Sequence, residues 1–235
     1  MRSDTTAGSS ETTVTDPLWV HGLMWLGFPL LGALAGWLLK ISAHWIVSLP
    51  WAPLQGPFKL IASIPEPQAA IGAVVVGALA GLVFAFLGAA ESLTVTVATS
   101  RVILKRGSGA PRQIARGQVD GVFLDGRQLV LLGRGGQELA REKSDLAGTR
   151  LTDAFRRHSY PWLTDGDPYR DEYRRWVPDI PDLPTGADAL FKARERALRK
   201  GDHTDQAELR DELAKLGIVV RDEDKRQYWR RSGQR

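Results

Sequence analysis

The chain has 235 residues, of which 25% are charged, and its formal net charge of +4 permits anionic partners without requiring them. It contains no cysteine, which excludes disulfides, thiolate metal sites and a cysteine nucleophile, and suits a chain that faces the cytosol. Its four histidines are scattered along the sequence, so we expect no metal site and no cofactor.

The first segment, residues 1–17, is rich in Ser and Thr and shows no apolar periodicity. Such a composition predicts a disordered tail. Its charges are one arginine against three acidic residues, which is unlike the positive start of a signal peptide.

Two long apolar runs follow, at about 22–47 and 68–90. A helix that crosses a bilayer needs about 20 apolar residues. The second run carries no charge, whereas the first reaches this length only by continuing past Lys40, whose stem can extend to the headgroups. The alternative is a pair of buried core helices in a soluble protein. We expect residues 18–91 to form a two-helix transmembrane hairpin in the lipid bilayer of the cell membrane.

The pentapeptide Gly-Ala-Leu-Ala-Gly occurs in both runs. Each copy places two glycines four positions apart on one helix face, where small residues let two backbones approach closely in lipid. We therefore predict that the two helices pack on each other through Gly32, Gly36, Gly77 and Gly81. Chance in a Gly/Ala-rich segment and formation of a homo-oligomer through the same face are the open alternatives.

Basic residues close to the second run predict the orientation of the helices. The segment after it carries Arg101, Lys105, Arg106 and Arg112, whereas the connection between the runs, residues 48–67, offers only Lys59. The connection is therefore expected outside and both termini in the cytoplasm. The four basic residues either contact anionic headgroups, worth about 1 kcal/mol each, or only set this topology.

Lys40 and His44 lie four positions apart in the first run. An ionisable pair inside a membrane is a functional-site hypothesis by default. The alternative is an interfacial anchor, because the helix leaves the bilayer core near Trp45.

From Ser92 the pattern changes to the two-residue period of short strands, with the hairpin signal Asp125-Gly126 among them. A helix is expected at about 149–158. Residues 92–162 therefore predict a small antiparallel β-barrel or sandwich closed by one helix, and the chain as a whole an α+β membrane protein.

This order, with Tyr160-Pro161-Trp162 after the helix and the apolar hairpin before the strands, resembles the bacterial pleckstrin-homology-like (PH-like) domain of the YqeB family of membrane proteins. The resemblance covers about residues 18–162 and implies a fold that binds lipids, peptides or proteins without a catalytic centre. In agreement, Gly133–Gly136 lacks the Lys-Ser/Thr of a phosphate-binding loop and is expected to be a turn. No nucleophile–His–acid set can be assembled, so we expect no catalytic residues.

Residues 163–186 contain several prolines and predict a semi-extended linker with at most a single helical turn near its centre. Residues 187–235 then predict two helices separated at Gly201-Asp202, where Asp202 can cap the second helix. A short strand at 218–220, a turn at 222–224 and an antiparallel return at 227–231 complete this module.

The module resembles the extreme C-terminus of cysteinyl-tRNA synthetases through Leu209–Leu213, Leu216–Val219, Asp222 and Trp229–Arg231. In that family the segment contacts the anticodon region of tRNA. Three departures weaken the transfer of this role, at His203, at Gln206-Ala207 and at Arg226. The catalytic domain and zinc-ligand cysteines of a synthetase are absent from the chain, so it is not expected to aminoacylate tRNA.

The candidates for RNA or partner binding are the basic and aromatic residues of the module: Lys192, Arg196, Arg199, Lys200, Arg210, Tyr228, Trp229, Arg230 and Arg231. Many acidic residues offset their charge, so a protein-docking or purely structural role is the competing interpretation. We expect a non-enzymatic membrane scaffold that binds an unknown cytosolic protein. The alternative is a membrane-tethered protein that binds tRNA or another RNA.

Overall fold

The computed structural model describes residues 11–47, 65 and 67–233, and the chain divides into two compact units. The helical unit contains residues 15–94 and 105–110. The α+β unit contains the residues up to 14, residues 95–104 and those from 111 onward. The α+β unit is therefore interrupted in sequence by the helical unit.

The helical unit consists of apolar helices whose bounds follow the two apolar runs of the sequence. The first run forms α1 (Leu18–Gly22), a π-helical turn η1 (Leu23–Gly27) and α2 (Phe28–Val47) without a break. The second run forms α4 (Gln68–Glu91), which begins directly after Pro67. Both helices are long and apolar enough to cross a membrane.

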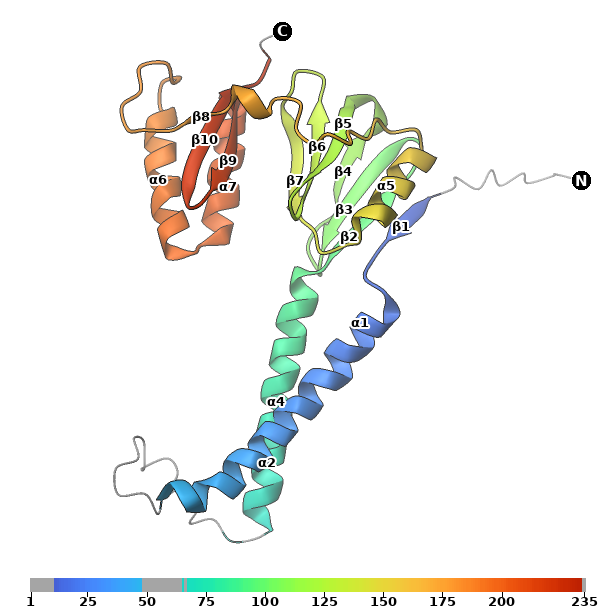
Figure 1. The fold of residues 1–235 in the computed structure, drawn as a ribbon, viewed down its shortest axis with the longest axis vertical. Coiled ribbons are helices and arrows are strands. Elements are labelled where there is room, and N and C mark those ends of the chain that lie inside the picture. Colours follow the sequence, from blue (N-terminus) through green and yellow to red (C-terminus); the bar gives the residue numbers. More distant parts are fainter. Residues whose placement is uncertain (1–10, 48–64, 66, 234–235) are drawn as a thin grey trace, which may run out of the picture. The chain divides into compact units, whose positions relative to one another are not determined.

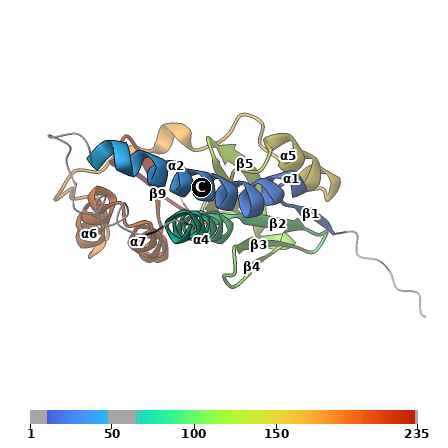
Figure 2. The same cartoon turned by 90° about the horizontal axis from the view of Figure 1, so that it is seen from below.

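Helices α2 and α4 lie side by side in both views (Figures 1 and 2). Their glycines form the contact: a Cβ atom added to Gly32 would overlap the carbonyl oxygen of Gly77, and the reverse substitution would overlap that of Gly32. Gly36 meets Ala73 and Gly81 meets Phe28 in the same way. The backbones approach so closely because no side chain separates them.

The outer faces of these helices are apolar and uncovered. Leu30 is 68% exposed, Val76 67% and Phe84 62%, and many other large apolar side chains of both helices are exposed as well. Soluble monomers rarely expose contiguous apolar surface of this extent. The pattern is opposite to that of a buried core helix, which was the alternative interpretation of the sequence.

The α+β unit begins with a strand that the sequence did not predict. Residues Thr12–Val14 form β1, which pairs antiparallel with β2 (Leu93–Val97), so that Val14 lies opposite Val95. The prediction of a disordered tail at 1–17 is therefore wrong for Thr12–Val14, and residues 1–10 lie outside the described chain. Strands β3 (Arg101–Arg106) and β4 (Arg112–Ala115) complete a sheet of order β1-β2-β3-β4.

A second antiparallel sheet contains β5 (Val119–Asp125), β6 (Gln128–Gly133) and β7 (Glu138–Lys143). The hairpin predicted at Asp125-Gly126 is confirmed, since Asp125 pairs with Gln128 across it. The short 3₁₀ turn η2 (Arg116–Gln118) connects the two sheets. Helix α5 (Gly148–Arg157) follows β7 and buries Leu151, Ala154 and Phe155. We call β1–β7 with α5 the β-domain.

The C-terminal module contains η3 (Arg170–Glu172), β8 (Arg174–Arg175), α6 (Ala187–Lys200), α7 (His203–Lys215), β9 (Ile218–Glu223) and β10 (Arg226–Arg231). Its sheet has the order β8-β10-β9, so part of the expected linker belongs to the module. The expected turn at 222–224 lies instead at Asp224-Lys225, where both residues have positive φ. Trp176 stacks on Phe191 in the core, with ring centroids 5.4 Å apart.

Candidate binding site at the domain interface

The second sheet of the β-domain contacts the C-terminal module through a small set of polar side chains and backbone groups. Arg221 of β9 donates from Nη2 to Oδ1 of Asp125, 3.2 Å away at the end of β5. Arg230 of β10 donates to the carbonyl oxygen of Gly136 at 2.6 Å. The amide of Gly233 donates to the carbonyl oxygen of Gly135 at 2.7 Å. We call this region the domain interface.

Arg141 organises the β-domain side of the domain interface. Its guanidinium contacts Glu138 at 2.7 Å and Asp125 at 2.9 Å, and also donates to Gln128. The Arg141 side chain is only 3% exposed. Burial alone would lower the pKa of Arg141, but the hydrogen bonds and negative charges of Glu138 and Asp125 raise it. Arg141 therefore stays charged and holds both carboxylates in place.

Arg194 plays the corresponding role inside the module. It is fully buried on α6 and donates from Nη1 and Nη2 to the two carboxylate oxygens of Asp222, at 2.5 and 2.6 Å. Gln227 and the carbonyl oxygen of Gln206 accept its remaining hydrogen bonds. This two-point geometry is the strong form of an arginine–carboxylate pair and links α6 to β9.

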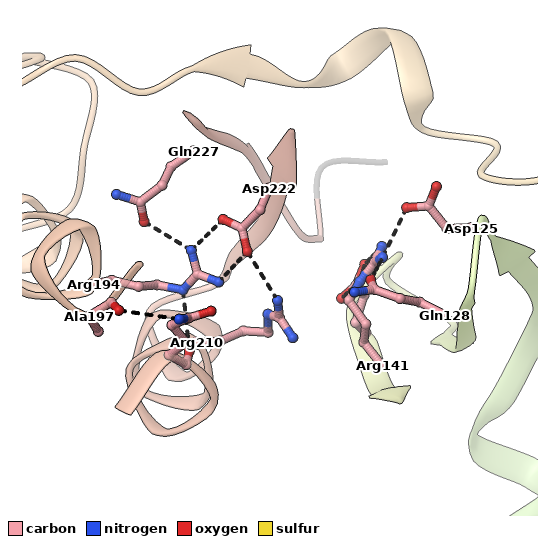
Figure 3. A network of polar contacts seen from close by, with 10 residues as sticks. Asp125, Gln128, Arg141, Arg194, Ala197, Arg210, Asp222 and Gln227 are labelled. Atoms are coloured by element: carbon pink, nitrogen blue, oxygen red, sulfur yellow. Dashed lines mark hydrogen bonds and ion pairs between the residues drawn. The ribbon is translucent and has the colours of Figure 1, made fainter. Parts of the chain in front are cut away.

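Arg210 of α7 lies between these two clusters (Figure 3). One of its Nη atoms is 3.5 Å from Oδ2 of Asp222, the oxygen that Arg194 already binds. Its Nε is buried and has no hydrogen-bond partner among the described residues. Burial, followed by the positive charges of Arg194 and Arg141, lowers the pKa of Arg210.

A cavity of about 140 Å³ lies beside Arg210 at the domain interface. Gln137 and the β7 residues Ala140 and Arg141 line it from the β-domain, and Arg210, Ala214 and Ile218 line it from the module. The carboxylates of Glu138, Glu142 and Asp211 also line it. Its walls therefore combine small apolar side chains with guanidinium groups and carboxylates from both domains.

Arg230 anchors the end of β10 against the chain that precedes the module. Its guanidinium lies over the ring of Tyr169, 4.3 Å from the centroid, and 5.3 Å from that of Tyr173. Cation–π contacts of this kind strengthen when they are desolvated, and Arg230 is buried. Burial, together with the nearby charge of Glu138, raises the pKa of Tyr173, so its phenol stays protonated at neutral pH.

The predicted binding residues on α6 divide into two groups. Lys192 is engaged, since its Nζ lies 2.9 Å from a carboxylate oxygen of Asp179 and 2.7 Å from one of Asp188. Arg196, Arg199 and Lys200 are exposed, and Arg199 has only a 3.6 Å contact with Glu195. The exposed group lies on one helix and leaves three cationic side chains at the surface.

The predicted residues near the C-terminus lie mostly inside the module. Trp229 is buried in its core and Arg230 is buried at the domain interface, so neither presents its side chain to solvent. Tyr228 is half-buried, and Arg231 is exposed and donates to the carbonyl oxygen of Asp182. Arg210, as described above, faces the β-domain.

The four basic residues predicted at the membrane surface occupy β3 and β4. Arg101 pairs with Glu11 at 3.3 Å, and Arg106 donates to the carbonyl oxygen of Glu91 at 2.7 Å. Lys105 and Arg112 are exposed. The side chain of His44, and residues 48–64 of the connection between the apolar helices, lie outside the described part of the chain.

Apart from Arg210 and Arg230, the residues of the domain interface were not predicted as site residues from the sequence. Asp125 and Asp222 were assigned to turns and Arg141 to a strand, whereas Arg221 was assigned to no element. Arg194 and Asp222 also belong to the stretch that resembles the synthetase C-terminus. The available signal was the position of Arg194 on the apolar side of its predicted helix, three residues from both Phe191 and Ala197, because a charge on a core-facing side requires a partner. Among the described residues, no group of three His, Cys, Asp or Glu side chains could hold a metal ion.

The fold and this interface define a class of protein: a β-domain interrupted by two apolar helices and followed by a small docked α+β module. Residues 12–163 match the model of the YqeB-like bacterial PH domain, and the chain belongs to that family. Residues 180–230 match the cysteinyl-tRNA ligase anticodon binding domain. The chain is similar to the protein YqeB of Bacillus subtilis (strain 168), being 41% identical over 231 residues that cover 98% of this chain and 93% of the relative. No solved structure matches.

Proposed function

We propose that this protein is an integral membrane protein that holds a non-enzymatic binding platform, the β-domain with its docked module, at one membrane face. The observation that carries the proposal is the pair of apolar helices α2 and α4, whose outer faces are exposed. Placing these faces in lipid removes their apolar surface from water, and within each helix the backbone bonds are satisfied internally.

The register of the first sheet supports a hairpin topology. Strand β1 precedes the apolar helices, β2 follows them, and the two strands are antiparallel neighbours with Val14 opposite Val95. The chain therefore leaves the sheet and returns to it from adjacent positions, which requires an even number of membrane crossings. The basic residues after Glu91, among them Arg101 and Lys105, favour the cytoplasm for the sheet and for both termini.

Topology reporters test this arrangement. A reporter that is active only outside the cytoplasm should give a signal when fused after Ala62, and a cytosolic reporter should be active when fused after Arg235. A fusion of each reporter at the other position is the matched control. A cytosolic signal from the fusion after Ala62 would contradict the proposed topology.

The binding role is supported by the kinds of domain that match, a PH-like domain and an anticodon-binding domain. We propose a cytosolic protein as the partner, and a second copy of the chain as a further partner within the bilayer. Crosslinking in cells, followed by identification of bound protein and RNA, tests the role. Recovery of no partner that depends on the α+β unit would contradict it.

A membrane-tethered RNA-binding protein is the second candidate function. The match of residues 180–230 and the exposed cations Arg196, Arg199 and Lys200 favour it. The full chain, in nanodiscs of neutral lipid, should bind tRNA with an affinity that falls as salt rises, because phosphate binding releases counterions. Arg196→Glu combined with Lys200→Glu should abolish binding, whereas Arg157→Glu on α5 serves as control. Absence of binding at low salt would reject this function.

A further inference from the structure

The domain interface holds more buried positive than negative charge. Arg194 binds both oxygens of Asp222, which leaves Arg210 a single 3.5 Å contact with a carboxylate that is already committed. Two arginines thus share one carboxylate. The Arg210 side chain is 22% exposed and its Nε is buried. A largely buried charge without a full partner is costly, so this arrangement favours an additional negative group beside Arg210.

The neighbouring carboxylates do not supply that group. Glu138 and Asp125 are held by Arg141, and Asp125 also accepts from Arg221. The cluster therefore contains four arginines (141, 194, 210 and 221) against three carboxylates (125, 138 and 222), an excess of one positive charge.

Other charged residues lie at the rim of the cavity. Arg112 and Asp211 are exposed, where solvent screens them, and Glu142 is half-buried with a polar contact of its own. These rim charges affect the half-buried side chain of Arg210 less than its buried neighbours Arg141 and Arg194 do. In agreement, burial and the charges of Arg194 and Arg141 dominate the lowered pKa of Arg210.

The cavity beside Arg210 limits the size of a ligand. Its volume of about 140 Å³ is well below the roughly 300–1,000 Å³ of sites for drug-sized molecules. Ala140, Ala214 and Ile218 give it apolar walls, and charge–charge interactions strengthen in such surroundings. The cavity therefore suits a compact group that carries a full negative charge.

We propose that this cavity binds a compact oxyanion of the phosphate class through the guanidinium of Arg210. Arginine matches the geometry of phosphate oxygens, and the buried Nε of Arg210 is a donor that lacks a partner among the described residues. Because both domains line the cavity, the anion links the β-domain to the C-terminal module. The ligand is free phosphate or the terminal phosphate of a small phosphomonoester.

The test uses the full chain in nanodiscs of phosphatidylcholine, titrated with inorganic phosphate at constant ionic strength, with chloride as the matched anion. Phosphate should raise the thermal midpoint in a saturable manner, since a ligand that binds only the native state stabilises it. Arg210→Gln should weaken the phosphate affinity at least tenfold, whereas Arg157→Gln on the exposed face of α5 should leave it unchanged. Glycerol phosphate in place of phosphate distinguishes a phosphomonoester from the free ion.

A second variant separates binding from folding. Ala207→Leu lies on the exposed side of α7, lines the same cavity and keeps every charge. It should abolish the phosphate effect while the circular dichroism spectrum and the thermal midpoint without phosphate stay native. The proposal is overturned if phosphate has no saturable effect on the native chain, or if Arg210→Gln and Ala207→Leu both retain the native affinity.

Discussion

Arg221 and Asp125 join the two parts of the α+β unit, and the same carboxylate is held from the other side by Arg141. The Asp125 carboxylate thus accepts hydrogen bonds from arginines of both domains. Its position at the turn after β5 is fixed by the hairpin with β6, and the position of Arg221 is fixed by its pairing with Tyr228 in β10. Two rigid hairpins therefore set the contact.

Removal of Asp125 should weaken the domain interface strongly. Asp125→Ala leaves the buried Arg141 with one carboxylate and Arg221 with none, and breaking a buried pair costs about 3–5 kcal/mol. Urea unfolding of the full chain should show a loss near the lower end of that range, because Asp125 is 20% exposed. Asp145→Ala removes an exposed pair with Arg127 and should cost about 0.5 kcal/mol. Equal losses in both variants would contradict this role of Asp125.

A bulky residue at Gly77 should separate the apolar helices. Gly77→Leu places a side chain against the backbone of Gly32, whereas a Cβ on Gly72 of the same helix meets nothing. The chain has no native cysteine, so a pair introduced at Trp25 and Phe86, whose rings are 4.9 Å apart, can be crosslinked selectively in membranes.

The expected result is a large loss of crosslinking with Gly77→Leu and none with Gly72→Leu. A yield that is insensitive to both substitutions would mean that the glycine contact does not hold the helices together.

Alkaline pH should destabilise the β-domain through Tyr160. Its hydroxyl donates to the carbonyl oxygen of Ala98 at 2.9 Å, and burial raises its pKa above 10. The native state therefore binds this proton more tightly than the unfolded chain does, so the stabilisation is complete below pH 10. It is lost as the pH rises from 10 through the native pKa.

Urea midpoints at pH 8 and pH 11 measure this effect. Tyr160→Phe should cost about 1 kcal/mol at pH 8, the net value of a hydrogen bond, and should show a smaller further loss at pH 11 than the native chain. The raised pKa of the buried Tyr173 contributes to the pH dependence that remains in both proteins. An unchanged pH dependence in the variant would exclude Tyr160 as its source.

Asp202 should control the first turn of α7. Its carboxylate accepts from the amide of Asp205 at 3.1 Å, and loss of such a cap costs about 1 kcal/mol. Hydrogen exchange of the first-turn amides should therefore become about fivefold faster in Asp202→Ala. Glu208→Ala, an exposed change in the middle of the same helix, should leave these amides unaffected.

The regular elements were predictable because their signals are local. The two-residue period of Leu93–Val97, the hairpin at Asp125-Gly126 and the cap at Asp202 each depend on neighbours in sequence. Strand β1 was missed because three residues carry too little periodicity, and β8 was missed because its only signal is its partner, β10.

The interface residues were unpredictable for a different reason. The partner of Arg221 lies in another domain, and no spacing along the chain reports that proximity. Trp229 illustrates the same limit, since an aromatic residue followed by two arginines suits both a stacking surface and a core position. In the structure, Trp229 packs in the buried cluster with Trp176 and Phe191, so it occupies a core position.

The pairing of β1 with β2 has a consequence for biogenesis. Strand β1 is synthesised first and has no partner until both apolar helices have emerged and β2 follows them. On the proposed topology, a chain whose first helix inserts alone leaves Thr12 across the membrane from His158, with which it otherwise shares a hydrogen bond of 2.9 Å. On that topology, the first sheet closes only in chains whose two apolar helices have both crossed the bilayer.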